Sequence, residues 1–255
     1  MGTVHVLEAL RFLEKKCTAV LITTDKVYEN KEWIYPYKEE DPLGGYDPYS
    51  ASKACAEIVI NSYKNSFFNI DHYQDHQKAI ATGRAGNVIG GGDWAKDRLI
   101  PDIVRAVSEK ETVIIRSPNA TRPWQHVLEP LYGYLLLGSQ LDKAPQIFSG
   151  AWNFGPDIKD NLSVREIVEK CISIWGQGDY EVIPHDGIMH EANLLRLDIS
   201  KATIKLGWIP RFSADQAIGL TLNWYKNYLQ NPVDAKALVT ADIEAFAKNE
   251  LVNTL

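Results

Sequence analysis

The sequence predicts an α/β fold in which helices cover a parallel sheet. A continuous, β-rich apolar run at residues 18–23 is typical of a strand that is buried on both faces, and residues 79–88 are another strand candidate. Helical patterns separate these runs, and this alternation favours βαβ units. With 255 residues, 45% of them hydrophobic, the chain is long and apolar enough to bury the core that such a fold requires.

The individual elements follow from local patterns. The chain opens with apolar residues at helical spacing over 3–14. The helix that follows the first strand has the clearest start, because Asp47 can cap it and Pro48 suits its first turn. After the second strand comes the loop Gly90-Gly91-Gly92. Further helices are expected at 98–109, 126–140, 163–176, 199–206 and 213–229, with a strand at 112–115 and a partly helical tail after Pro232.

Composition excludes several classes of function. The formal net charge is −6 and charges of both signs are interspersed, so no basic surface for nucleic acid or an anionic membrane is expected. No apolar run approaches the roughly 20 residues of a spanning helix. The three cysteines are few, odd in number and widely spaced, which favours free thiols and a cytoplasmic location. His72 and His76 lie in a polar stretch without further ligands, so no metal is expected.

Two groups of polar residues point to chemistry. Tyr49 and Lys53 lie four residues apart on the predicted helix and therefore share one face. A phenol with a pKa of about 10 is a poor base, but a neighbouring ammonium favours the phenolate. Thr24, Asp25 and Lys26 follow the first strand, at the end of a parallel sheet where ligands bind. Taken alone, the Tyr49 and Lys53 spacing is better explained by an ordinary solvated pair, and the strand-end residues are better explained by a turn with an Asp cap and a solvated Lys.

Several longer sequence segments resemble those of a known family. Thr24-Asp25-Lys26-Val27-Tyr28 and Tyr49-Ser50-Ala51-Ser52-Lys53 resemble the extended short-chain dehydrogenase/reductase family, the NAD-dependent epimerases and dehydratases of nucleotide sugars. The Asp25-Lys26 pair narrows this likeness to the 4,6-dehydratases that act on CDP-glucose, because relatives acting on dTDP-glucose usually carry Asp-Glu there. The likeness runs to about residue 230 and includes the segments 29–33, 44–48, 86–94, 98–101, 122–127, 152–156, 190–192 and 206–210.

The resemblance implies a lyase that converts CDP-glucose to CDP-4-keto-6-deoxyglucose and water, with NAD as a temporary hydride store. Tyr49 would remove the proton of the sugar 4-hydroxyl, Lys53 would hold the nicotinamide ribose, and Thr24 would hydrogen-bond the reacting oxygen. Asp25 would protonate the departing 6-hydroxyl. Lys26 would take the C5 proton or stabilise the enolate as a cation. Such products usually enter bacterial surface-sugar assembly, as in lipopolysaccharide O-antigen.

Substrate binding and assembly are implied in the same way. Asn87, Arg98 and Arg122 would contact the nucleotide diphosphate, with Arg122 able to bind phosphate oxygens in bidentate fashion. Glu191 would reach the nucleotide ribose. A loop cap at Asn87 and surface ion pairs at the arginines are the ordinary alternatives. The family likeness also implies a homodimer through a helix bundle that includes residues 48–66.

The resemblance implies a partial Rossmann-like, doubly wound parallel sheet with a smaller C-terminal substrate-binding lobe. The chain contains no Gly-x-Gly-x-x-Gly turn, so the NAD-anchoring start and first strands of the family fold are expected to be missing, and the 255 residues alone are not expected to retain NAD or turn over substrate. The expected divisions are 1–88 and 118–155 for the NAD-binding domain, 89–117 and 156–230 for the nucleotide-sugar lobe, and 231–255 for a tail.

Two other functions stay open at this stage. One is a nucleotide-sugar dehydratase or epimerase acting on a dTDP- or GDP-sugar, against which Asp25-Lys26 and the run 122–127 argue. The other is a non-catalytic truncated remnant or partner subunit. Long drift is argued against by four intact candidate residues, Tyr49, Lys53, Thr24 and Asp25, although a recent truncation leaves them in place.

Overall fold

The computed structural model describes residues 1–160, 162–183, 194–230 and 234–252, apart from the side chains of 249–252. Within it the chain forms two compact units. Unit 1 contains residues 1–86, 130–155 and 195–209, and unit 2 contains 87–129, 156–194 and 210–255.

Unit 1 is built on a parallel three-stranded sheet with the strand order β1-β2-β7. The strands are β1 (Cys17–Ile22), β2 (Lys78–Ala85) and β7 (Gly150–Phe154). Every residue of the central strand β2 is buried. The predicted parallel sheet is therefore confirmed, but β1, which was predicted to be buried on both faces, is only half-buried and ends in the exposed Ile22.

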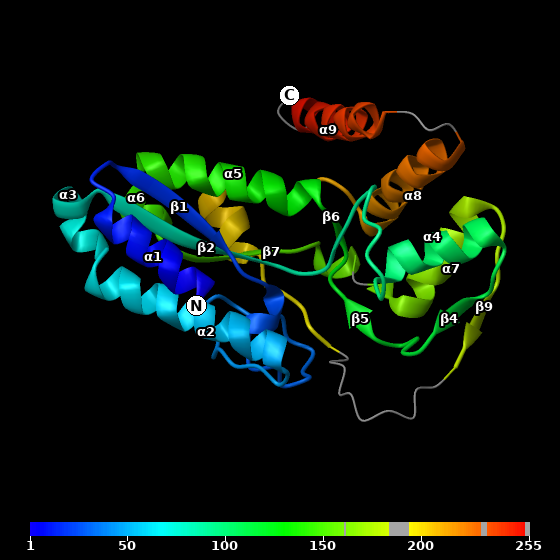
Figure 1. Cartoon of the computed structure of the whole chain (residues 1–255), viewed down its shortest axis with the longest axis horizontal. Coiled ribbons are helices and arrows are strands. Elements are labelled where there is room, and N and C mark those ends of the chain that lie inside the picture. The colour runs from blue at the N-terminus through cyan, green and yellow to red at the C-terminus, as the bar shows by residue number, and fades with distance from the viewer. Residues whose placement is uncertain (161, 184–193, 231–233, 253–255) are drawn as a thin grey trace. The chain divides into compact units, whose positions relative to one another are not determined.

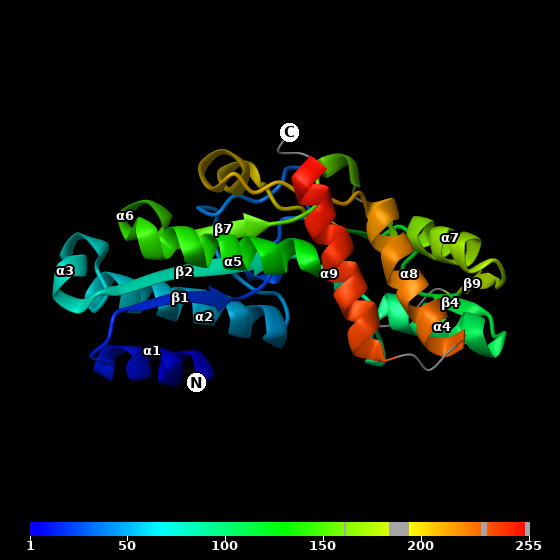
Figure 2. The same cartoon turned by 90° about the horizontal axis from the view of Figure 1, so that it is seen from above.

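Helices cover both faces of this sheet (Figures 1 and 2). On one side lie α1 (Gly2–Phe12) and α2 (Pro48–Ser66), and on the other lies α5 (Leu128–Lys143). Side chains of β2 alternate between the two layers. Ile80 belongs to the cluster with Leu7 of α1 and Ile60 of α2. Its neighbours Ala79 and Ala81 belong to the cluster of Leu137 and Leu141 on α5.

The start of α2 has the predicted cap. The Asp47 carboxylate accepts hydrogen bonds from the Ser50 backbone N–H at 3.0 Å and from the Ser50 hydroxyl at 2.5 Å, and Pro48 occupies the first turn. An N-cap of this kind is worth about 1 kcal/mol. It fixes the first residue of the helix, and therefore the direction in which the following turn presents its side chains.

Short elements complete unit 1. The buried Trp208 meets Phe154 edge to face, with 5.1 Å between ring centroids, and so joins residues 195–209 to the sheet layer. The predicted boundaries placed these residues in the nucleotide-sugar lobe. The periodicity of a segment does not show which of two cores the segment packs against. The short elements are η1 (Asp25–Val27), η2 (Ile70–His72), α3 (Tyr73–His76), α6 (Pro145–Phe148) and the π-helix η4 (Ala202–Leu206).

Unit 2 packs helices around a separate core. Its helices are α4 (Leu99–Glu109), α7 (Val164–Trp175), α8 (Ala214–Gln230) and α9 (Ala235–Val252), with the short turn η3 (Ile158–Asp160). Buried Ile103, Ile167 and Leu222 bring α4, α7 and α8 into one cluster. No helix in the described part of the chain is both long enough and apolar enough to cross a membrane.

Three two-stranded pairings complete unit 2. In parallel, β3 (Val88–Ile89) pairs with β6 (Gln125–His126), and β4 (Val113–Ile115) pairs with β9 (Tyr180–Val182). In antiparallel fashion β5 (Thr121–Arg122) pairs with β8 (Leu162–Ser163). Residues 118–129 lie in unit 2 and not with 130–155 as predicted, because β5 and β6 find their backbone partners there.

The loop Gly90-Gly91-Gly92 also has its contacts within unit 2. A Cβ atom at Gly91 would overlap the ring of Trp224 from α8, and Gly92 has a φ of +86° that disfavours other residues. These glycines therefore allow the loop backbone to pack directly against an indole ring.

Candidate functional site

The candidate catalytic segment lies at the carboxyl end of β1. Thr24 and Asp25 are only 7% and 2% exposed, whereas Lys26 is exposed. The Thr24 hydroxyl donates to Asp25 Oδ1 at 2.9 Å and accepts from the Lys26 backbone N–H at 3.4 Å. Val27 and Tyr28 anchor the segment in the core beneath. A hydroxyl and a carboxyl group are thus held in place where open parallel sheets bind ligands.

Helix α2 supplies the other two candidates. Tyr49, in the first turn, is 51% exposed, and Lys53 is half-buried one turn later. The Lys26 ammonium lies 5.9 Å from the centroid of the Tyr49 ring. Because this contact joins η1 to α2, the candidate acid, hydroxyl and phenol all lie near one another in unit 1.

A buried ion pair locks α2 onto the sheet. Glu57 lies one turn after Lys53 and is 4% exposed. Its carboxylate accepts hydrogen bonds from Nε and Nη2 of Arg84, both at 2.9 Å. It also accepts from the hydroxyls of Thr23 at 2.5 Å and Thr82 at 3.1 Å. Since Thr23 directly precedes Thr24, this pair sets the candidate segment against the helix that carries Tyr49 and Lys53.

The network continues on the far side of Arg84. Arg84 Nη1 donates to the Tyr28 hydroxyl at 2.9 Å and to the Glu39 carbonyl at 3.0 Å. The Tyr28 hydroxyl donates to Asn153 Oδ1 at 2.7 Å. Sequence reasoning missed these as functional residues. The signal that could have revealed the Glu57–Arg84 pair is the position of Glu57, an acidic residue on the buried face of α2.

Burial and partners shift the protonation of this network. Burial raises the pKa of Glu57, but the hydrogen bonds and charge of Arg84 outweigh it and hold that pKa below its usual value. Burial would lower the pKa of Arg84, and the Glu57 carboxylate reverses this, so the pKa of Arg84 is raised. The pair is therefore ionised at neutral pH.

The candidate substrate residues lie in unit 2. The backbone carbonyl of half-buried Asn87 accepts a hydrogen bond from the Gln125 backbone N–H at 3.1 Å. Arg122 ends β5, shortly before β6, and is only 6% exposed. Arg98 is exposed at the start of α4, with its Nε 3.7 Å from Asp93 Oδ2. The backbone bond thus brings Asn87 and the β5–β6 segment together. Glu191 lies outside the described residues.

Two further titratable groups are buried in unit 2. Glu129 is 1% exposed, and one of its oxygens accepts the backbone N–H groups of Arg211 at 2.9 Å and Phe212 at 2.7 Å. Burial raises the pKa of Glu129 to about 7. His126 is equally buried, and burial lowers its pKa to about 4, so the imidazole is neutral at physiological pH.

A parallel α/β sheet with a Tyr-x-x-x-Lys helix at its carboxyl end defines the class of extended short-chain dehydrogenases/reductases. The sequence profile described as GDP-mannose 4,6 dehydratase matches residues 1–221. The chain belongs to this family.

Curated relatives include several 4,6-dehydratases. The chain is 48% identical over 230 residues to CDP-glucose 4,6-dehydratase of Salmonella typhimurium, a match that covers 90% of this chain and 64% of that protein. It is 24% identical over 212 residues to dTDP-glucose 4,6-dehydratase of Streptomyces antibioticus, covering 82% of this chain and 57% of the relative. The chain thus spans less than two thirds of the length of these relatives.

Solved structures share the fold. DesIV, a dTDP-glucose 4,6-dehydratase from Streptomyces venezuelae with NAD and TYD bound, has a TM-score of 0.74 at 22% identity, over 89% of this chain and 65% of that one. UDP-glucuronic acid 4-epimerase from Bacillus cereus, in complex with UDP-glucuronic acid and NAD, also has a TM-score of 0.74, at 20% identity, over 88% and 66%. At these identities the likeness establishes the fold alone.

Proposed function

We propose that this protein is an NAD-dependent hydro-lyase that converts CDP-glucose to CDP-4-keto-6-deoxyglucose and water. The observation that carries the proposal is the placement of Thr24, Asp25 and Lys26 beside the Tyr49 helix at the carboxyl end of the sheet. The similarity to the Salmonella CDP-glucose 4,6-dehydratase supports the choice of substrate. We further propose that it acts in the cytoplasm as a homodimer through a bundle that includes α2.

The residues present fit the nicotinamide-ribose end of NAD. The Tyr49 phenol is half exposed beside the strand end, and the half-buried Lys53 lies one turn away on the same helix. A ribose that lies against both residues can accept a hydrogen bond from the Lys53 ammonium. NAD, when bound, supplies the acceptor of two electrons from sugar C4 and later their donor to C6. The chain has no Gly-x-Gly-x-x-Gly turn for the pyrophosphate end.

The side chains divide the proton transfers. Tyr49 acts as a phenolate, a form that the Lys53 ammonium stabilises; it takes the proton of the 4-hydroxyl while C4 is oxidised and becomes a neutral phenol. Thr24 donates a hydrogen bond to the 4-oxygen. A ketone at C4 acidifies the hydrogen at C5, which is otherwise too weakly acidic for a side-chain base. Oxidation at one carbon therefore enables elimination at the next.

Elimination needs an acid at C6 and a base that takes the C5 proton, and a cation can stabilise the enolate that forms. Asp25 donates a proton to the departing 6-hydroxyl. In this structure the single O–H of Thr24 donates to Asp25, so it turns from Asp25 to the substrate when it donates to the 4-oxygen. Lys26 either takes the C5 proton or stabilises the enolate as a cation. Lys26→Arg separates these roles, because an arginine keeps the charge but does not accept a proton at working pH.

Unit 2 supplies the groups that recognise the nucleotide. Asn87, Arg98 and Arg122 bind the diphosphate, and the planar guanidinium of Arg122 suits two phosphate oxygens at once. Glu191 binds the nucleotide ribose. Loss of Arg122 is expected to raise KM by about tenfold or more, because a charge-assisted hydrogen bond contributes roughly 1.5–3 kcal/mol.

The proposal is tested in a chimera that joins this chain to the part of the Salmonella relative that it does not match. With CDP-glucose, mass spectrometry should show a product that has lost one water, and Tyr49→Phe should abolish its formation. The 255-residue chain, assayed alone beside the chimera, is expected to be inactive. A folded chimera that dehydrates dTDP-glucose faster than CDP-glucose, or neither of them, contradicts the assignment.

A further inference from the structure

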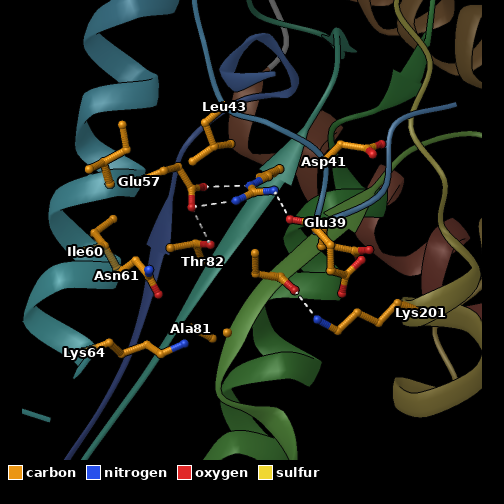
Figure 3. Close-up of a pocket in the computed structure, with 15 residues that line it drawn as sticks. Glu39, Asp41, Leu43, Glu57, Ile60, Asn61, Lys64, Ala81, Thr82 and Lys201 are labelled. Carbon is orange, nitrogen blue, oxygen red and sulfur yellow. Dashed lines mark hydrogen bonds and ion pairs between the residues drawn. The ribbon is translucent and has the colours of Figure 1, made fainter. Parts of the chain in front are cut away.

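A cavity of about 390 Å³ lies within unit 1, apart from the five candidate catalytic residues (Figure 3). This volume falls in the range of small-molecule sites, roughly 300–1,000 Å³. Its wall is formed by α2, β2, the segment 39–43, the start of β7 and Lys201. The proposed dehydration uses none of these groups in its chemistry.

Two lysines form one end of the cavity. Lys64 comes from α2, and Lys201 comes from the segment that leads into η4; both are half-buried. Lys201 Nζ donates to the Ala151 carbonyl at 2.7 Å, which leaves further N–H groups for a ligand. Lys64 Nζ makes no hydrogen bond or ion pair with the described residues. A half-buried ammonium without an acceptor is a costly arrangement that an anion would relieve.

The electrostatics of this end support an anionic ligand. Burial lowers the pKa of Lys64, and the positive charge of Lys201 lowers it further. Gly150, with a φ of +117°, adds no side chain; a Cβ there would come within 3.7 Å of Lys64 Nζ. The backbone therefore leaves the space beside the ammonium open.

Carboxylates line the rest of the cavity, and those of Glu39 and Glu40 lie close enough to Lys201 to oppose the lowering of its pKa by burial. Glu57 is fully engaged by Arg84, and a Glu39 oxygen accepts the Asn153 backbone N–H at 2.9 Å. Asp41 also lines the cavity (Figure 3). Carboxylate oxygens accept hydrogen bonds from hydroxyl groups but repel a second anionic group. The cavity therefore favours a ligand with one anionic end and one hydroxyl-bearing end.

We propose that this cavity binds a small polyhydroxylated phosphate or carboxylate, with its anionic group between Lys64 and Lys201 and its hydroxyls toward Glu39 and Asp41. The site is separate from the diphosphate-binding residues of unit 2. It does not depend on the proposed dehydration.

Isothermal titration calorimetry of the 255-residue chain tests the site with glucose 1-phosphate, gluconate, inorganic phosphate and glucose as probes. Glucose 1-phosphate or gluconate should bind with one-to-one stoichiometry, inorganic phosphate more weakly, and glucose not at all. Lys64→Gln should weaken binding about tenfold, because it removes one charge-assisted contact. Lys15→Gln, a change at an exposed lysine outside the cavity, is the matched control and should leave binding unchanged.

Arg122→Gln separates this site from the diphosphate residues of unit 2. Binding that is weakened by Lys64→Gln and retained in Arg122→Gln supports the proposal. Binding that Lys64→Gln leaves intact, binding that Arg122→Gln removes, or no binding of either hydroxylated anion overturns it. Should Lys64→Gln fail to fold, Asn61→Trp decides in the same way, because it fills part of the cavity from an exposed position.

Discussion

A buried glutamate of unit 1 and a buried glutamate of unit 2 differ in their hydrogen-bond donors and in the direction of their pKa shifts. Glu57 in unit 1 and Glu129 in unit 2 are 4% and 1% exposed. Glu57 bonds to a guanidinium and two hydroxyls, and its pKa lies below the usual value. Glu129 accepts two backbone N–H groups, and burial raises its pKa to about 7. Burial alone therefore does not set the charge of a carboxyl group.

The two pKa values shift in opposite directions because different groups donate hydrogen bonds to the two carboxylates. Neutral N–H groups offset part of the desolvation of a carboxylate, whereas a bidentate arginine offsets all of it. In unit 1 the retained charge also has a structural use, because it ties α2 to β2 next to the candidate catalytic segment. In unit 2 the glutamate joins the start of α5 to the segment before α8, and either protonation state can accept these bonds.

Removal of the arginine should have the largest effect on stability. Arg84→Met leaves Glu57 buried without its partner and should lower the free energy of unfolding of unit 1 by about 3–5 kcal/mol. Urea unfolding, with hydrogen exchange to locate the loss, measures this. The double variant Glu57→Leu with Arg84→Met should recover most of the stability. A single variant as stable as the parent chain would show that the pair is not what anchors α2.

The second prediction concerns Glu129, the buried glutamate whose pKa is raised. Its pKa is raised from 4.5 to about 7, so the stability contributed by the neutral form is fully present below pH 4.5 and is lost as the pH rises through 7. At pH 8, Glu129→Gln should therefore raise the free energy of unfolding by about 3 kcal/mol, because it keeps the acceptor without the charge. At pH 4 the two proteins should be equally stable. Identical pH profiles of parent and variant would contradict the raised pKa.

Glu57 should show the reverse dependence on pH. Its pKa is lowered in the folded state, so its contribution is present above the usual 4.5 and is lost as the pH falls through the lower folded value. Glu57→Gln should cost about 2 kcal/mol at pH 7, within the range for a charged hydrogen bond. The cost should shrink in acid, where the parent carboxylate is protonated too. Acid titrations of both proteins by circular dichroism provide the comparison.

The smallest effect is expected at the edge of the network. Tyr28→Phe removes the hydroxyl that accepts from Arg84 and donates to Asn153, and should cost about 1 kcal/mol. Tyr37→Phe, which removes a hydroxyl bonded outside this network, is a matched control. If both variants lose the same stability yet the Arg84 region exchanges its amide hydrogens no faster in Tyr28→Phe, Tyr28 does not belong to the anchoring network.

Much of the candidate site could be predicted because its residues lie close together in the sequence. Tyr49 and Lys53 share a helix face by spacing, and Thr24 to Lys26 share a strand end by adjacency. Their mutual placement across η1 and α2 followed from the parallel sheet. The Glu57–Arg84 pair was not predicted because its two residues are 27 positions apart and belong to different elements. A local sequence pattern does not indicate ion pairs over such a separation.

Local sequence patterns predicted the main helices, the strands β1, β2 and β4, the parallel character of the sheet and the cap of α2, because periodicity and turn chemistry act over a few residues. They did not predict β7, the third strand of the sheet. Only the tertiary structure decided that residues 118–129 pair within unit 2 while 195–209 return to unit 1. It alone placed Lys64 and Lys201 around one cavity and decided which buried glutamate keeps its charge. These outcomes depend on partners that are distant in the chain, and burial gives such partners their energetic weight.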